Sequence, residues 1–312
     1  MGQSHRFSRQ IVIPVLALVC LPLLFVGGPG PYSMRTFSYA WGLGHLVCFA
    51  LWGWLYLRWR VGQPLWRQVF EVLLLALLLG AGTELLQAMI GRQATWQDLG
   101  NDVLGALLAL VFSPQVKHRF QRWPLWGIRL PALLLVGWIV LPFLQVMADD
   151  LIAHQQFPLL SGFETPLEPS RWGGNSSRRL DREIRASGAA ALRVDLNTDR
   201  YSGLSLKHFP ADWSRHRALS FQLYNSQPVP FELHFRIHDQ AHRANDNRYS
   251  DRFNTSLLLQ PGWTELEFSL EEVAKAPKGR QMDLSRIAGI VLFVGKLEEP
   301  KTFYLDDVQL IQ

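Results

Sequence analysis

Residues 83–102 have the sequence TELLQAMIGRQATWQDLGND, which places polar and ionisable side chains inside an otherwise apolar region. An ionisable group in hydrocarbon costs roughly 2.5–3.5 kcal/mol at a helix centre, so such groups are candidates for a functional role. In this stretch the polar side chains lie near the end of one apolar run, in the short turn that follows it, and at the start of the next apolar run. The polar side chains of this stretch include Glu84, Gln87, Arg92, Asp98, Asn101 and Asp102.

The composition changes on either side of this stretch. Of the 312 residues, 48% are hydrophobic, but residues 11–147 are dominated by apolar side chains and residues 162–312 have a mixed composition. A membrane helix needs roughly 20 apolar residues. We therefore expect a membrane all-α bundle of about five transmembrane helices, an all-β jelly-roll sandwich and a linker between them. The expected domains are 1–148, 149–161 (the linker) and 162–312, and the expected spans are 11–27, 39–57, 69–90, 99–116 and 130–147.

The basic residues of the membrane half predict its orientation. Beyond residue 162, Lys+Arg and Asp+Glu balance, so the net charge of +5 belongs to the membrane half. Nine of its eleven basic residues fall on one side of the expected spans, and cytoplasmic loops carry the Lys/Arg excess. We expect a multi-pass protein of the bacterial inner membrane with a cytoplasmic N-terminus and an extracytoplasmic C-terminal domain. The nine residues are Arg6, Arg9, Arg58, Arg60, Arg67, Lys117, Arg119, Arg122 and Arg129.

The expected spans place His45 and Glu84 at the same depth below the outer surface, as pairing would require. Gln87 lies one turn from Glu84, and Asp98 and Asn101 are likewise three residues apart. Two interpretations stay open: a buried structural clasp, and a polar pocket for a membrane or lipid-linked partner. A third interpretation is a metal site formed by His45 and Glu84. It is disfavoured because one histidine and one carboxylate make a poor set of metal ligands.

At these positions the chain resembles the VanZ-like family, over roughly residues 39–112. The shared pattern is a histidine in an early span, E-x-x-Q, a nearby arginine, and D-x-x-N before a glycine-containing span. This chain has Trp41-Gly42-Leu43-Gly44 where family members often carry Asp-Lys before the histidine. The resemblance implies an envelope membrane protein with a link to glycopeptide susceptibility. The matching residues are His45, Glu84, Gln87, Arg92, Asp98, Asn101 and Gly105.

The C-terminal half alternates between apolar and polar residues, as in FELHFRIH (231–238) and TELEFSL (264–270). Strict alternation indicates half-buried strands, and many short strands with turn signals favour a β-sandwich. The sequence order resembles the galactose-binding-like jelly roll of carbohydrate-binding modules and the complex I intermediate-associated protein family. The segments that carry this resemblance include YSGLSLKHF, DWSRHRALSFQLYN, PGWTELEFSL and FYLDDVQLI.

Glycan binding requires exposed aromatic rings with polar side chains beside them. The candidate rings are Trp172, Tyr201, Trp213, Tyr249 and Trp263, of which we expect Trp213 and Trp263 to be packed in the core. The candidate glycan-binding residues are Glu232, His234, Arg236, Tyr249 and Arg252, although a solvated strand face is the simpler interpretation of the first three.

Jelly rolls of this type often carry a structural calcium ion, and Glu164 with Asp306 or Asp307 fits its placement. Two acidic positions do not by themselves make the six to eight oxygen ligands that calcium prefers. We expect no other cofactor.

No catalytic motif is present: the sequence lacks G-x-S-x-G, H-E-x-x-H and a Gly-rich phosphate loop. We therefore expect a non-enzymatic envelope protein that binds the bilayer, a cell-envelope glycan and a membrane or lipid-linked partner, and no nucleic acid. The alternative is an enzyme acting on a lipid-linked cell-wall or polysaccharide precursor, with Glu84 or Asp98 as general base and Arg92 holding phosphate.

Overall fold

The computed structural model describes residues 15, 18–20, 22, 24, 28–89, 96–119 and 122–312. It divides into two compact units, Met1–Leu144 and Gln145–Gln312. Each unit has its own hydrophobic core. The two are therefore described separately.

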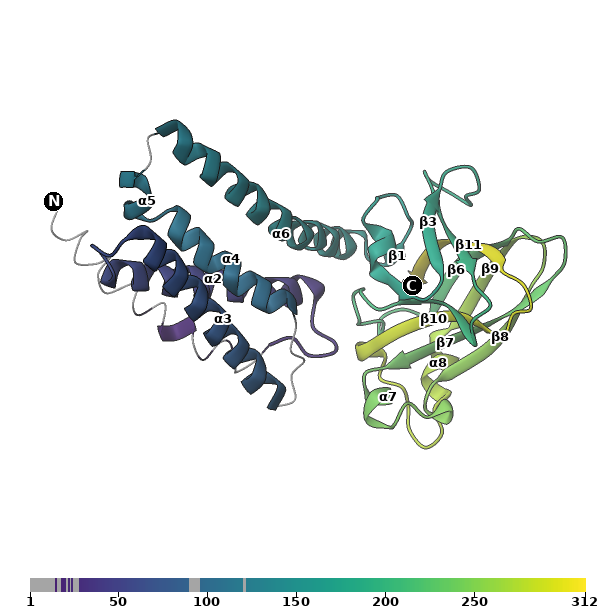
Figure 1. Ribbon diagram of the computed structural model, residues 1–312. Helices are drawn as coiled ribbons and strands as arrows, with labels where there is room; N and C mark the ends of the chain where they lie inside the picture. The colour runs from purple at the N-terminus through teal and green to yellow at the C-terminus, as the bar shows by residue number, and fades with distance from the viewer. Residues whose placement is uncertain are drawn as a thin grey trace. The chain divides into compact units, whose positions relative to one another are not determined.

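The first unit is helical (Figure 1). Among the described residues, three helices are long and apolar enough to cross a membrane: α2, α3 and the part of α6 from residue 125 onward. Large apolar side chains such as Trp59, Leu78 and Trp138 are exposed on them, as lipid-facing positions would be. The helices are α2 (Arg35–Trp59), α3 (Leu65–Met89), α4 (Trp96–Val111), α5 (Pro114–Arg119) and α6 (Arg122–Gln156).

The expected count of five spans is not confirmed. Most of the first expected span, 11–27, lies outside the described residues. The fourth, 99–116, corresponds to α4, whose 16 residues fall below the roughly 17–25 that cross a bilayer. Its polar start shortens the apolar part of the helix.

Helices α2 and α4 pack closely because small residues line their contact (Figure 1). A Cβ atom at Gly105 would lie 2.9 Å from the backbone nitrogen of Ala50 and closer still to the carbonyl oxygen of Leu46. Gly53 of α2 faces Ala106 and Ala109 of α4 in the same way. Gly105 is the glycine of the VanZ-like pattern noted in the sequence.

The second unit is a sandwich of two antiparallel sheets (Figure 1). One sheet has the order β3-β4-β11-β6-β9, with β1 paired to β11, and the other has the order β2-β5-β10-β7-β8. The strands are β1 (Leu159–Ser161), β2 (Trp172–Gly174), β3 (Ser177–Asp181), β4 (Ala191–Leu196), β5 (Tyr201–Leu206), β6 (Ala218–Asn225), β7 (Phe231–Asp239), β8 (Phe253–Leu259), β9 (Gly262–Ser269), β10 (Ile287–Gly295) and β11 (Lys301–Ile311). Short helices join some of them: η1 (Glu168–Arg171), α7 (Ala241–Ala244), η2 (Tyr249–Asp251), α8 (Leu270–Lys275) and η3 (Leu284–Arg286).

The core of the sandwich comes from the alternation seen in the sequence. On β7, the odd-numbered residues from Phe231 to Ile237 are buried, and the residues between them are partly or fully exposed. Phe235 packs against Phe268 and Phe221 with ring centroids 4.5 and 5.1 Å apart. Alternation therefore predicted both the strand and the face that it buries.

Residues 149–161, predicted as a linker, form the last turns of α6 and strand β1. The cause is a buried ion pair within the second unit. The Arg171 side chain donates from Nη2 to Asp149 Oδ1 at 2.8 Å and from Nε to both carboxylate oxygens. This pairing fixes the end of α6 to the sandwich, and composition gave no sign of it.

Candidate functional sites

The first candidate site is a polar cluster between helices α2, α3 and α4. His45, Glu84, Gln87 and Asn101 are all buried there, and Asp98 is half-buried. The sixth predicted residue, Arg92, lies outside the described residues. Of the described members, His45, Glu84 and Asp98 lie close together, and a function for the cluster stays a prediction.

A residue that we had not included in the cluster completes it. Asp102 is fully buried, and its Oδ1 lies 2.8 Å from Nδ1 of His45. A histidine held by a carboxylate in this way has a fixed ring orientation. The available signal was spacing: Asp102 follows Asp98 by four residues and precedes Gly105 by three, on the α4 face that packs against α2.

Two members of the cluster bind backbone carbonyl groups. Gln87 donates from Nε2 to the carbonyl oxygen of Leu24 at 2.7 Å, and Asn101 donates from Nδ2 to that of Gly42 at 3.1 Å. Both bonds join segments distant in the sequence. Gln87 and Asn101 thus act structurally, as the clasp interpretation predicts.

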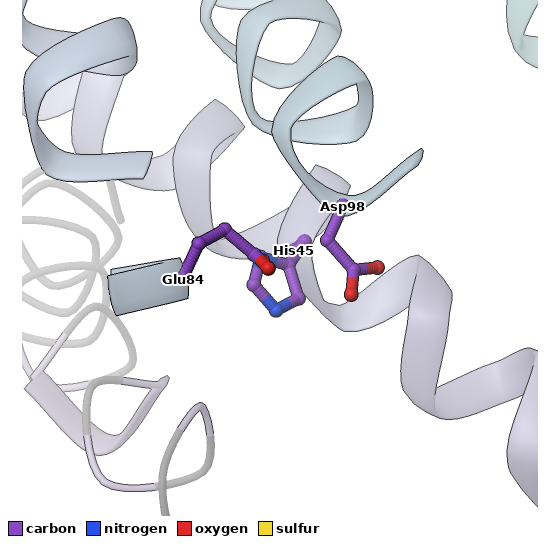
Figure 2. Close-up of side chains that lie close together, drawn as sticks. All are labelled: His45, Glu84 and Asp98. Atoms are coloured by element: carbon purple, nitrogen blue, oxygen red, sulfur yellow. The ribbon is translucent and has the colours of Figure 1, made fainter. Parts of the chain in front are cut away.

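His45, Glu84 and Asp98 point toward one another from three helices (Figure 2). Their potential ligand atoms all lie within 4.8 Å of one another. The structure therefore adds a third donor, Asp98, to the pair considered from the sequence. One imidazole and two carboxylates, with Asp102 orienting the ring, have the chemistry of a proton-transfer site or a divalent-cation site.

The second candidate site is a cleft of about 630 Å³ on the outer face of the β2-β5-β10-β7-β8 sheet. The strand register places the side chains in rows across four strands. Val291 of β10 lies between Ser205 of β5 and Arg236 of β7, and Arg236 pairs in turn with Asn254 of β8. The next row runs from Gly203 through Phe293 and His234 to Ser256.

Two exposed tyrosines contribute to the cleft from different sides of β10. Tyr201 on β5 is 56% exposed and its ring lies edge-on to Phe293, with centroids 6.1 Å apart. Tyr249 in the loop between β7 and β8 is 72% exposed, and the Arg252 guanidinium lies 5.3 Å from its ring centroid. Between them His234 Nδ1 lies 3.0 Å from the hydroxyl of Ser256.

The loop that carries Tyr249 and Arg252 is held by a residue that the sequence analysis did not identify. Arg280 donates to both carboxylate oxygens of Asp239 at 2.6 and 2.8 Å, and to both of Asp251 at the same two distances. This pairing holds the pKa of Asp251 well below its usual range. Asp239 and Asp251 are the two ends of one loop, so Arg280 fixes both ends.

Four of the five predicted glycan-binding residues line this cleft: His234, Arg236, Tyr249 and Arg252. Glu232 instead lines a neighbouring hollow of about 590 Å³, to which His234 also contributes. Their binding of glycan stays a prediction. Tyr201 belongs to the cleft as well.

The candidate tryptophans have other roles. Trp172 is buried and donates from Nε1 to the Ser161 hydroxyl at 3.0 Å, so its proposal as an exposed sugar platform was wrong. Trp213 is fully buried, as expected. Trp263 is half-buried and packs against Tyr224.

The predicted calcium ligands both bind the loop between β3 and β4. Glu164 accepts the backbone N–H of Ala189, and Asp306 Oδ2 accepts those of Ala186 and Ser187. These carboxylates thus tie down the loop through amide donors, which is a sufficient reason for acids at these positions. Calcium binding by Glu164 and Asp306 stays a prediction.

No protein-family model and no curated protein matches the chain. Among solved structures, a family 11 carbohydrate-binding module from Clostridium thermocellum, in complex with a β-1,3-1,4-mixed-linked tetrasaccharide, is similar at 19% identity and a TM-score of 0.39. The match covers 49% of this chain and 94% of that one. A family 30 module of a cellulosomal cellulase of the same organism is 14% identical, with a TM-score of 0.34 and coverages of 46% and 91%. An exo-β-agarase is 20% identical, with a TM-score of 0.38 and coverages of 49% and 24%.

Proposed function

We propose that the chain is a bacterial envelope protein of the inner membrane whose C-terminal sandwich binds glycan outside the cytoplasm. The observation that carries the proposal is the cleft on the β2-β5-β10-β7-β8 sheet. It combines exposed tyrosine rings with several hydrogen-bonding side chains in one hollow of about 630 Å³. The excess of basic residues on one side of the apolar spans supports a cytoplasmic N-terminus.

The chemistry of the cleft fits a sugar chain. The apolar face of a pyranose ring packs on an aromatic ring, and Tyr201 and Tyr249 offer rigid, amphipathic rings at low entropic cost. Hydroxyl groups of the sugar need donors and acceptors, which Ser205, His234 and Ser256 provide. Few polar groups in fixed positions on a largely preformed surface are typical of a small-ligand site.

A binding assay on the full chain in detergent tests this proposal. Wild type, Tyr201→Ala and Tyr249→Ala are compared by affinity electrophoresis through a panel of neutral and acidic polysaccharides. Each substitution is expected to weaken binding about tenfold, the loss of about 1.4 kcal/mol. Leu258→Ala is the control, because Leu258 is exposed on the same sheet and does not line the cleft. Absence of retention on every polysaccharide would overturn the proposal.

For the helical unit, the proposal is that the polar cluster holds a membrane or lipid-linked partner. Its support is the convergence of His45, Glu84 and Asp98 from three helices together with the resemblance to the VanZ-like family. That resemblance implies a link to glycopeptide susceptibility.

An enzymatic function for the same cluster is favoured by one observation, the His45–Asp102 pair. A ring oriented by a carboxylate can accept a proton from a substrate hydroxyl or water, and Glu84 and Asp98 lie beside it. The substrate would be a lipid-linked precursor. Mass spectrometry of such precursors after incubation with wild type or Glu84→Gln detects turnover.

The variant Glu84→Gln also separates function from structure, because the two side chains have nearly the same shape. If Glu84→Gln abolishes an effect of the protein on glycopeptide susceptibility while its melting temperature and abundance are unchanged, the result supports a pocket. Lower melting and abundance would support the structural clasp instead and remove both functions proposed for the cluster.

A further inference from the structure

The charged residues that line the cleft are all positive. Its lining contains two arginines, Arg236 and Arg252, and none of the described residues that line it is an aspartate or a glutamate. The second unit as a whole contains 20 basic and 22 acidic residues, so the positive lining of the cleft is a local property. A neutral sugar chain requires no such arrangement.

Neither arginine has a carboxylate partner within the described part of the chain. Asp239 and Asp251, at the two ends of the adjoining segment, are both bound by Arg280. Arg252 donates from Nε to the amide oxygen of Asn254 at 2.8 Å, which leaves its charge uncompensated. The Nε of Arg236 is buried and has no hydrogen-bond partner among the described residues.

The two side chains also destabilise each other. Burial lowers the pKa of Arg236 to about 10, and the charge of Arg252 adds to this shift. Burial likewise lowers the pKa of Arg252. Two like charges in a partly desolvated site are unfavourable, and a bound anion would relieve both the repulsion and the missing hydrogen bond.

We propose that the cleft selects anionic polysaccharides, whose acidic groups bind Arg236 and Arg252 while sugar rings pack on Tyr201 and Tyr249. The two arginines are neighbours: Arg236 pairs in register with Asn254, and Asn254 holds Arg252. A guanidinium group binds a carboxylate or a sulfate through two parallel hydrogen bonds. The proposal rests on glycan binding in this cleft and names its ligand class.

The experiment uses the full chain in detergent with two matched pairs of polymers. The pairs are polygalacturonate with its carboxyl-reduced form, and dextran sulfate with dextran. Wild type is expected to bind one acidic polymer at least tenfold more tightly than its neutral partner, and less tightly as salt increases. The pair that shows the preference identifies the acidic group as carboxylate or sulfate.

Arg252→Gln is expected to reduce the preference for the acidic polymer by about tenfold. Arg236→Gln should lose the preference, whereas Arg236→Lys, which keeps the charge but cannot form two parallel hydrogen bonds, is expected to retain only part of it. Arg217→Gln is the control for general attraction to a polyanion, because Arg217 is 63% exposed and does not line the cleft.

The outcomes are distinguishable. Equal binding of acidic and neutral polymers overturns the selectivity and leaves glycan binding in place. Equal losses in Arg252→Gln and Arg217→Gln show non-specific attraction and overturn the selectivity too. Failure to bind any polymer in the panel overturns the proposed function itself.

Discussion

Arg280 gives the most direct test of how the cleft is built. The change Arg280→Gln removes a guanidinium that makes four hydrogen bonds of 2.6–2.8 Å to two carboxylates. Asp239 is fully buried, so the substitution leaves a carboxylate in the protein interior without its cation. Tyr249 lies between these acids and Arg252 directly follows Asp251, so both stability and binding should change.

The magnitude follows from burial. Removing one partner of a buried ion pair costs about 3–5 kcal/mol. The Arg280 side chain is 23% exposed, so water can reach part of the vacated space, and we expect a value near the lower end, about 3 kcal/mol. One kcal/mol shifts the melting temperature by about 2–4 °C for domains of roughly 150–250 residues, which predicts a decrease of about 6–12 °C.

Thermal unfolding of the full chain in detergent, followed by tryptophan fluorescence, measures this shift. Arg217→Gln is the matched control, since its exposed pair with Glu267 contributes at most about 1 kcal/mol. Polysaccharide affinity is then measured well below the melting transition, where we expect a further loss because Tyr249 and Arg252 are less well positioned. Melting of Arg280→Gln within 2 °C of wild type would show that the network does not support the fold, and the reasoning would be refuted.

Three further predictions concern other parts of the molecule. Gly105→Ala should lower both melting temperature and abundance in membranes, because its Cβ meets the α2 backbone, whereas Gly100→Ala on the same helix meets nothing within 4 Å and should be neutral. Burial raises the pKa of Asp306 to about 6, so the folded state holds this proton more tightly. The contribution of Asp306 to stability should therefore rise by up to about 3 kcal/mol as the pH falls from 7 to 4, and denaturant titration of Asp306→Asn at both pH values should show that this contribution is lost. Burial lowers the pKa of His238 to about 3, so its stabilising contribution is complete above about pH 6.5 and declines as the pH falls toward 3. Between pH 7 and pH 5, wild type should therefore lose about 2 kcal/mol of stability that His238→Gln does not lose, as measured by the same denaturant titration.

Local pattern predicted the elements of the sandwich well. The alternation in residues 231–238 and 264–270 marked β7 and β9 and identified their buried faces. Two-residue periodicity is a property of the strand itself, so it is visible in the sequence without any neighbour. The pairing of strands is not visible in the sequence in this way. Strand β7 lies between β10 and β8, and nothing in the sequence of β7 specifies β10 as its neighbour.

The helical unit shows the opposite limit. Apolar runs marked the long helices, but composition does not determine where a helix ends when polar residues can continue it. Helix α6 extends to Gln156 although the apolar run stops near residue 147, because Asp149 is bound by Arg171. A partner 22 residues away cannot be inferred from the helix sequence.

The same limit explains which site residues were missed. Asp102 and His45 are 57 residues apart, and Arg280 is 41 residues from Asp239. Each pair forms only when the tertiary fold brings separate elements together. The predicted members of both sites were found because unusual residue types stood out in a periodic pattern, whereas their partners looked like ordinary charged residues.

The charge of the cleft follows from this long-range pairing. Beyond residue 162 the chain contains as many acidic as basic residues, so the composition of the sandwich predicts no preference for a charged ligand. Arg280 binds Asp239 and Asp251, and Arg236 and Arg252 are the charged residues in the lining of the cleft. The positive potential is therefore produced by how ion pairs are distributed over the fold. We therefore expect Arg280 to affect the proposed glycan binding in two ways, by positioning Tyr249 and Arg252 and by pairing with Asp239 and Asp251.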